Sequence, residues 1–101
     1  MIGIICAMAL EANAITDTIE NKKIKNISGV DFVSGTIGGR ETVVAVCGVG
    51  KVFAAICAEA MILEYHPDAI INSGVAGSLC RSIKIGDIVI AESVVQHDMD
   101  T

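Results

Sequence analysis

The spacing of apolar residues changes from strand-like to helical within the first twenty positions of the chain. Residues 2–6 form a short β-branched run that predicts a buried strand. From residue 8 to about residue 20 the apolar positions recur at helical intervals, which predicts a helix. Those positions are Leu10, Ala14, Ile15 and Ile19. Lys22 and Lys23 follow, and we expect them near the C-terminus of this helix, where positive charge is favourable.

The next segment predicts a strand hairpin. Residues 24–27 are a candidate short strand, and Ser28-Gly29 is a candidate turn before a longer strand at residues 30–37. Gly38-Gly39 is a strong signal for a two-residue hairpin turn. The partner strand is then expected at residues 41–47, which are rich in valine.

A second helix and further strands are predicted in the remaining sequence. Residues 52–65 carry apolar or small side chains around most of the helix circumference, so we expect burial on several sides against a sheet. Pro67 ends this helix, and residues 69–72 predict another buried strand. After a glycine-containing loop, residues 87–95 predict a last strand. The order of elements predicts an α/β fold with a mixed or largely parallel sheet flanked by helices.

Three predicted loops follow strands of this sheet. They comprise residues 6–8, 48–50 and 74–77, and each is small or rich in glycine. Ligands of α/β proteins bind outside the carboxyl ends of the strands, and small residues allow close approach to the backbone. The sequence therefore predicts a small-molecule site at this edge.

Composition narrows the class of protein further. The 101 residues include 12 acidic and 7 Lys or Arg side chains, giving a net charge of −5, and 52% are hydrophobic. This content suits one globular domain and excludes intrinsic disorder. The acidic balance argues against nucleic acid or an anionic membrane surface as a partner. No apolar run reaches the length of a membrane span, and the first residues lack the basic leader of a secretory signal.

The cysteines are scattered, without a C-x-x-C pair. Cys6, Cys47 and Cys57 lie within apolar runs, and Cys80 completes the set. We expect small buried hydrophobes in a reducing cytoplasm, in preference to two disulfides or a zinc site.

Several motifs leave more than one interpretation open. Residues 48–51 (Gly-Val-Gly-Lys) fail the phosphate-loop pattern, because Ala45 and Val52 stand where it needs Gly and Ser or Thr. They form either a tight turn or a ligand-contacting turn. Glu11, in the first turns of the first helix, is either a partner of the helix dipole or a general base. His66 is expected to cap a helix end, and residues 97–100 to form a solvated turn more readily than a metal site.

The chain nevertheless resembles a known family. Residues 2–11 (IGIICAMALE), 48–52 (GVGKV), 70–77 (IINSGVAG), 86–89 (GDIV) and 97–100 (HDMD) occur in family order. Together they resemble the N-terminal part of a 5′-methylthioadenosine/S-adenosylhomocysteine nucleosidase, within the purine nucleoside phosphorylase superfamily. The resemblance implies a phosphorylase/hydrolase-like mixed sheet, with residues 1–101 forming the N-terminal half of a single domain.

The resemblance also implies roles for individual residues. In the family, water attacks the anomeric carbon while an acid protonates the purine, and Glu11 matches the glutamate that activates this water. Substrate-binding positions match Ala7, Met8, Val49, Val75, Ala76 and Gly77. Val75 stands where nucleosidases usually have serine. No metal or organic cofactor is implied, and the partners are a small nucleoside substrate and a second copy in a cytoplasmic homodimer.

The same resemblance weighs hydrolysis against phosphorolysis. Related phosphorylases carry phosphate-binding arginines where this chain has Glu11 and Asn72, and a carboxylate there repels phosphate and favours water. Arg40 falls where those enzymes have another phosphate arginine, which keeps a phosphorylase, or a related nucleoside hydrolase, as an alternative. The family's purine-stacking aromatic, ribose-binding glutamate and leaving-group acid have no matching positions here. We therefore expect the 101 residues alone to be inactive or nearly so, and a non-catalytic nucleoside-binding or assembly fragment is the alternative from another class.

Overall fold

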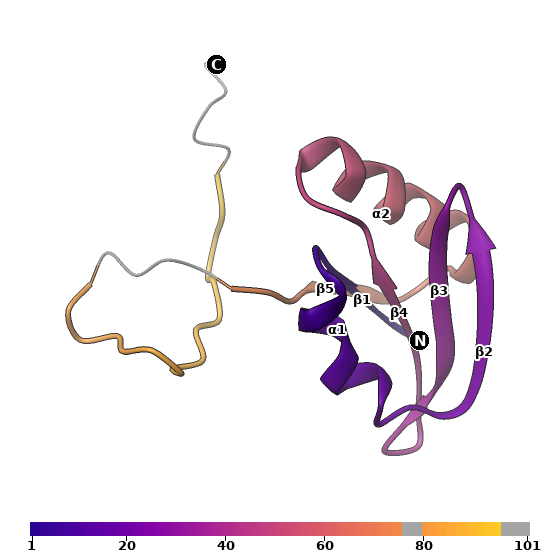
Figure 1. Ribbon diagram of the computed structural model, residues 1–101, viewed down its shortest axis with the longest axis horizontal. Helices are drawn as coiled ribbons and strands as arrows, with labels where there is room; N and C mark the ends of the chain where they lie inside the picture. Colours follow the sequence, from indigo (N-terminus) through magenta and orange to yellow (C-terminus); the bar gives the residue numbers. More distant parts are fainter. Residues whose placement is uncertain (76–79, 96–101) are drawn as a thin grey trace.

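The chain folds into one mixed sheet with a helix on each face. The computed structural model describes residues 1–75 and 80–95 (Figure 1). The elements are β1 (Ile2–Cys6), α1 (Ala9–Thr16), β2 (Glu20–Ile27), β3 (Val30–Ile37), β4 (Arg40–Val46), α2 (Lys51–Tyr65) and β5 (Ala69–Asn72). The strand order is β2-β3-β4-β1-β5. Strands β2, β3 and β4 are antiparallel neighbours, whereas β1 pairs in parallel with β4 and with β5. This is the α/β class that the sequence predicts.

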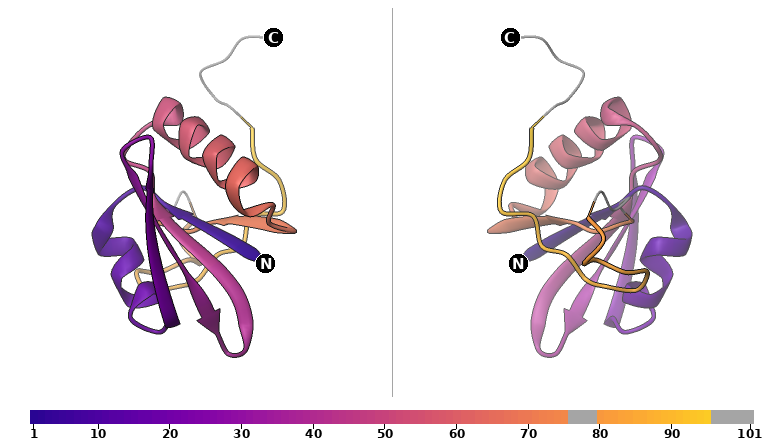
Figure 2. Two further views of the ribbon diagram at one scale, coloured as in Figure 1. Left: turned by 90° about the vertical axis from the view of Figure 1, so that its right-hand side faces the viewer. Right: turned by 90° about the vertical axis from the view of Figure 1, so that its left-hand side faces the viewer.

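Alternation along the central strands divides the core into two layers, since successive side chains of a strand point to opposite faces. On β1, Ile5 belongs to the cluster that packs against α2, and Cys6 belongs to the cluster that packs against α1. On β4, Val43 and Val44 divide in the same way. The two helices accordingly lie on opposite faces of the sheet (Figure 2).

Both predicted hairpin turns are confirmed. Ser28 and Gly29 join β2 to β3 with φ values of 53° and 80°, and Gly38 and Gly39 join β3 to β4 with 57° and 81°. Positive φ at both central residues is the type I′ geometry that suits the twist of paired strands. These turns position β4, whose carboxyl end carries one of the predicted site loops.

The prediction for residues 17–23 is wrong. Helix α1 ends at Thr16, where hydroxyl groups add to the backbone hydrogen bonds of the last turn. Thr16 Oγ1 donates to the Asn13 carbonyl and Thr18 Oγ1 to that of Ile15. Lys22 and Lys23 lie in β2, not at a helix end. Strand β2 is an edge strand, and lysines are typical of edges because they discourage pairing with other chains.

The second helix forms as predicted but is less buried than expected. Cys57 and Met61 are its buried residues, while Phe53, Ile56 and Leu63 are exposed. Strand β5 is exposed along its length as well. The helix covers the sheet with one side, and within the described residues nothing packs over its outer side. His66 ends α2 as predicted, in a left-handed conformation with its N–H donating to the Ile62 carbonyl.

The strand predicted at residues 87–95 is absent. This segment, orange to yellow in Figure 1, runs as irregular chain, and its apolar side chains are exposed. A strand needs a hydrogen-bonded neighbour, and none of the described strands pairs with these residues. None of the helices in the described part of the chain is long and apolar enough to span a bilayer.

Candidate functional site

The loops that follow the three parallel strands begin side by side. Beyond the strand ends, the N–H of Cys47 donates to the Cys6 carbonyl at 2.9 Å, and the N–H of Ser73 donates to the Ile5 carbonyl at 3.0 Å. These bonds extend the pairing of β4 and β5 with β1 up to the loops. The described parts of the segments predicted from sequence therefore begin at one edge of the sheet, where α/β proteins bind ligands.

Glu11 connects two of these loops through its carboxylate. It lies in the first turn of α1, directly after β1, and is half-buried. Oε1 accepts a hydrogen bond from the Met8 N–H at 2.9 Å, and Oε2 accepts one from the Val75 N–H at 3.1 Å. Met8 belongs to the loop after β1 and Val75 to the loop after β5. The carboxylate is therefore fixed at both oxygens by backbone groups from different strand ends.

This geometry fits both roles considered for Glu11. The bond to the Met8 N–H satisfies a donor at the helix N-terminus, as expected of a partner of the helix dipole. A carboxylate has about four acceptor positions, so two backbone donors leave others for water. A water bound there would lie next to a fixed proton acceptor, which is the arrangement that general base catalysis requires.

The Cys6 thiol lies close to this carboxylate. Burial, the negative charge of Glu11 and the neighbouring Cys47 together raise the pKa of Cys6 above its usual value. A raised pKa keeps the thiol protonated at neutral pH, and a protonated thiol is a poor nucleophile. Cys6 is thus a small packing residue under the site, and Cys47 and Cys57 are buried too, as predicted, whereas Cys80 is exposed.

The remaining site residues named from the sequence are only partly brought together. Ala7 and Met8 lie at the end of β1 next to Glu11, and the Val75 backbone contacts Glu11 although the Val75 side chain is 85% exposed. Val49 lies in the loop after β4, also with an exposed side chain. Ala76 and Gly77 lie outside the described residues.

Arg40 does not reach the candidate site within this chain. It is the first residue of β4, so it lies at the edge opposite the carboxyl ends of the parallel strands. There it contributes to lowering the pKa of Asp68, after the larger effect of the N-terminal amine. Asn72, by contrast, is the last residue of β5 and lies at the same edge as Glu11.

No metal centre is found in the part of the chain that the structure describes: no group of three or more His, Cys, Asp or Glu side chains converges there. His97, Asp98 and Asp100, considered above, lie outside the described residues.

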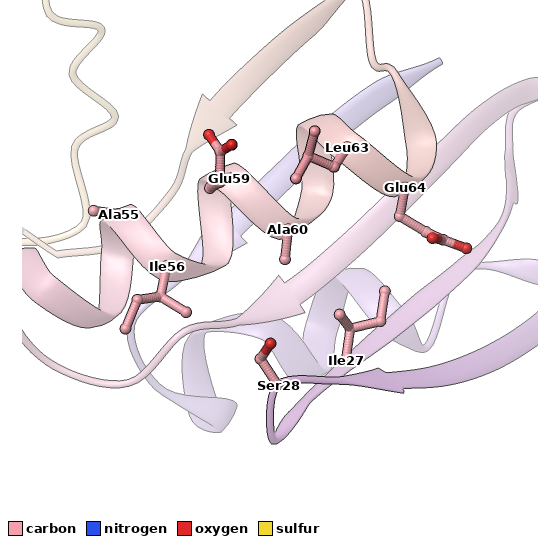
Figure 3. A pocket seen from close by; sticks show the side chains of 8 residues that line it. All are labelled: Ile27, Ser28, Ala55, Ile56, Glu59, Ala60, Leu63 and Glu64. Carbon is pink, nitrogen blue, oxygen red and sulfur yellow. The ribbon is translucent and has the colours of Figure 1, made fainter.

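A separate cavity of about 490 Å³ lies between α2 and the turn that joins β2 to β3 (Figure 3). Ile56 and Ala60 of the helix face Ile27 and Ser28 of the turn region. Its remaining lining residues are Ala55, Glu59, Leu63 and Glu64. The lining is mainly apolar, and none of the residues predicted for the nucleoside site belongs to it.

Sequence reasoning missed the part played by the backbone at this site. The N–H groups of Met8 and Val75 hold Glu11, and Gly74 lies directly against the carboxylate. Gly74 could be noticed from the sequence, since it follows a strand at the predicted ligand edge. Its contact with Glu11 could not be predicted, because the two residues are far apart in the sequence.

The fold defines an α/β protein with a candidate ligand site at the ends of its parallel strands, and comparison with known proteins identifies the family. The chain belongs to the phosphorylase superfamily, whose family model matches residues 1–101.

Individual relatives indicate a narrower group. A 5′-methylthioadenosine/S-adenosylhomocysteine nucleosidase of Shewanella piezotolerans is 44% identical over 99 residues, which cover 98% of this chain and 43% of the relative. The nucleosidase of Colwellia psychrerythraea, solved in complex with adenine, superposes with a TM-score of 0.83 at 32% identity, over 85% of this chain and 36% of that one. A futalosine hydrolase of Helicobacter pylori gives 0.78 at 33% identity, over 85% and 37%. The chain thus spans less than half the length of each.

Proposed function

We propose that this chain forms the water-activating side of a nucleosidase active site, in a protein that hydrolyses the N-glycosidic bond of 5′-methylthioadenosine and S-adenosylhomocysteine and releases adenine. The observation that carries the proposal is the Glu11 carboxylate, held by two backbone N–H groups at the ligand edge of the sheet. Support for the substrate class comes from the relatives, which include nucleosidases for these thio-nucleosides and one structure that contains adenine.

In the proposed reaction, Glu11 orients a water molecule and accepts its proton as the oxygen attacks the anomeric carbon. The glycosidic bond breaks, and its electron pair leaves with the purine. Ala7, Met8, Val49, Val75, Ala76 and Gly77 are proposed to contact the nucleoside around this water. Purine protonation is assigned to the part of the relatives outside the matched 43%. Since that stabilisation of the leaving group is a large share of catalysis, the 101 residues alone are expected to show little or no activity.

Hydrolysis is favoured over phosphorolysis by the charge at the site. A phosphate dianion placed where the water is proposed would face the negative charge of Glu11. Arg40, the residue that supported a phosphorylase, lies at the opposite edge of the sheet in this chain. Adenine release by the active protein is therefore expected to be independent of added phosphate.

The partner and compartment complete the proposal. Helix α2 leaves Val52, Phe53, Ile56, Ile62 and Leu63 exposed, and an apolar surface of this kind suits an interface. We assign it to a homodimer of the whole protein. Buried thiols at Cys6, Cys47 and Cys57 agree with a reducing cytoplasm.

A chimaera tests the reaction and the role of Glu11. This chain replaces the matched 99-residue segment of the Shewanella piezotolerans nucleosidase, and adenine release from 5′-methylthioadenosine is followed by chromatography with and without phosphate. Glu11→Gln is expected to lower kcat by roughly 100-fold or more, the usual contribution of a general base. Glu41→Gln, an exposed change at the opposite edge, is the matched control.

Three results would contradict the proposal. An inactive chimaera that is folded, or one that forms ribose 1-phosphate derivatives only when phosphate is present, excludes thio-nucleoside hydrolysis. Full activity in Glu11→Gln excludes the assigned role of Glu11. Futalosine is tested as an alternative substrate, because one of the similar structures is a futalosine hydrolase.

A further inference from the structure

We infer that Gly74 is a positioning residue for the reaction: the absence of a side chain at this position sets where the Glu11 carboxylate lies. The inference rests on the proposed function of Glu11 and adds a second residue to it. Gly74 is the second residue after β5, and its neighbour Val75 donates the N–H that holds Glu11 Oε2.

The space above Gly74 is filled by the carboxylate. A Cβ atom built on Gly74 would lie 2.9 Å from Glu11 Oε2, 3.5 Å from Cδ and 3.8 Å from Oε1. All three distances are to the carboxyl group of Glu11. Any side chain at position 74 therefore competes with the carboxylate for the same volume.

Glycine is required here for space and not for backbone conformation. Gly74 does not belong to the glycines with positive φ, which include Gly29 and Gly86. An alanine can thus adopt the backbone conformation of residue 74 without strain. The cost of the substitution falls on the contact with Glu11 alone.

An added methyl group would move the carboxylate more easily than the fold. The atom that must give way is the end of a flexible glutamate side chain, so a rotation of that chain relieves the contact. The rotation withdraws Oε2 from the Val75 N–H, now at 3.1 Å, and moves the proton acceptor relative to the water of the proposed reaction. Displacements of about 1 Å in a catalytic group can lower rates by about 100-fold.

The kinetic test uses Gly74→Ala in the same chimaera. We expect kcat to fall about 10- to 100-fold while KM changes less than about threefold, because the substrate contacts remain and the base is displaced. In a Glu11→Gln background, Gly74→Ala should cause no further loss of kcat, because both changes act through one carboxylate. Gly29→Ala is the matched control: it strains a turn with φ of 80° in open space, and its kcat should equal that of the parent.

A second measurement on the 101-residue chain is independent of activity. Both Glu11→Gln and Gly74→Ala should shift the amide proton signals of Met8 and Val75 in ¹H–¹⁵N spectra, since both alter the hydrogen bonds to the carboxylate. Gly29→Ala should leave these two signals in place. Shifts of these two signals support the inference even if the chimaera is inactive. Inactivity of the chimaera counts against the proposed function alone.

Unchanged Met8 and Val75 signals in Gly74→Ala would overturn the inference. So would parental kcat in Gly74→Ala when Glu11→Gln is strongly impaired, a pattern that leaves the proposed role of Glu11 intact. Gly74→Ala would also overturn the inference if it lowered kcat as much in the Glu11→Gln background as it does alone. Such a loss would show that Gly74 acts by a route other than the Glu11 carboxylate.

Discussion

The contact between Gly3 of β1 and Met61 of α2 gives a stability prediction that can be worked out from the structure. A Cβ built on Gly3 would lie 2.4 Å from Met61 Sδ, whereas non-bonded heavy atoms of this kind prefer about 3.5–4.0 Å. Met61 has no exposed surface, so its side chain has no free space into which to move. Gly3→Ala is therefore expected to cost about 1–3 kcal/mol of unfolding free energy, the range for overpacking a core.

Removing the methionine side chain should reverse this effect. Met61→Ala alone is expected to cost about 2–5 kcal/mol, because it leaves a cavity in the core between β1 and α2. In the double variant the alanine methyl at position 3 occupies part of that cavity. The combined loss should then be smaller than the sum of the single losses by at least about 1 kcal/mol.

Urea unfolding followed by circular dichroism measures all four members of this cycle. Ile62→Ala, at a half-exposed position on the same helix, is the control and should cost clearly less than Met61→Ala. Additive losses in the double variant, within about 0.5 kcal/mol, would show that Gly3 and Met61 do not share one space and would contradict this prediction.

Three further predictions concern packing and titration. Gly35→Ala should destabilise the chain by about 1–3 kcal/mol in urea unfolding, because a Cβ there would lie 2.4 Å from the Glu20 carbonyl oxygen, a backbone atom that cannot rotate away; a loss below about 0.5 kcal/mol would contradict this. Burial raises the pKa of the Cys57 thiol to about 11, so its contribution to stability is complete below the ordinary thiol pKa and is lost as the pH rises toward 11. Cys57→Ala should flatten the alkaline part of the stability profile, and an unchanged slope would count against the burial argument. The N-terminal amine of Met1, 2.8 Å from Asp68, lowers the pKa of that carboxyl. An NMR titration should place the Asp68 midpoint below the value of about 3.9 for a free aspartate, and acetylation of the amine should raise it toward that value.

The features that could be predicted from sequence are those that depend on neighbouring residues. The valine-rich run at residues 41–47 and the paired glycines 38 and 39 are local signals that favour a strand and a hairpin turn. The prediction for Lys22 and Lys23 failed because charge near a helix end and charge on an edge strand look alike locally. The order of strands in the sheet, which makes β2 an edge, distinguishes the two.

The candidate site shows the same division. The sequence indicated Glu11 and the small loops at the strand ends, since strand periodicity and glycine are local signals. It did not indicate that Val75, 64 residues away, donates to Glu11. The strand expected at residues 87–95 failed for a related reason: β-branched composition favours a strand, but pairing requires a neighbour, and the described strands offer none.

The hydrogen bond from the Met8 N–H to Glu11 gives one carboxylate two tasks, because it caps the N-terminus of α1 and also faces the ligand edge. Loss of such a cap costs about 0.5–2 kcal/mol. Alanine at position 11 would thus lower protein abundance and turnover together, so a survey of variants scored by growth alone would exaggerate the chemical importance of this residue. Glutamine keeps one carbonyl oxygen that can accept from the Met8 N–H for the cap, whereas its NH2 group can neither accept from the Val75 N–H nor act as a base. Comparing glutamate with glutamine at position 11 therefore separates what the reaction requires of this residue from what folding requires of it.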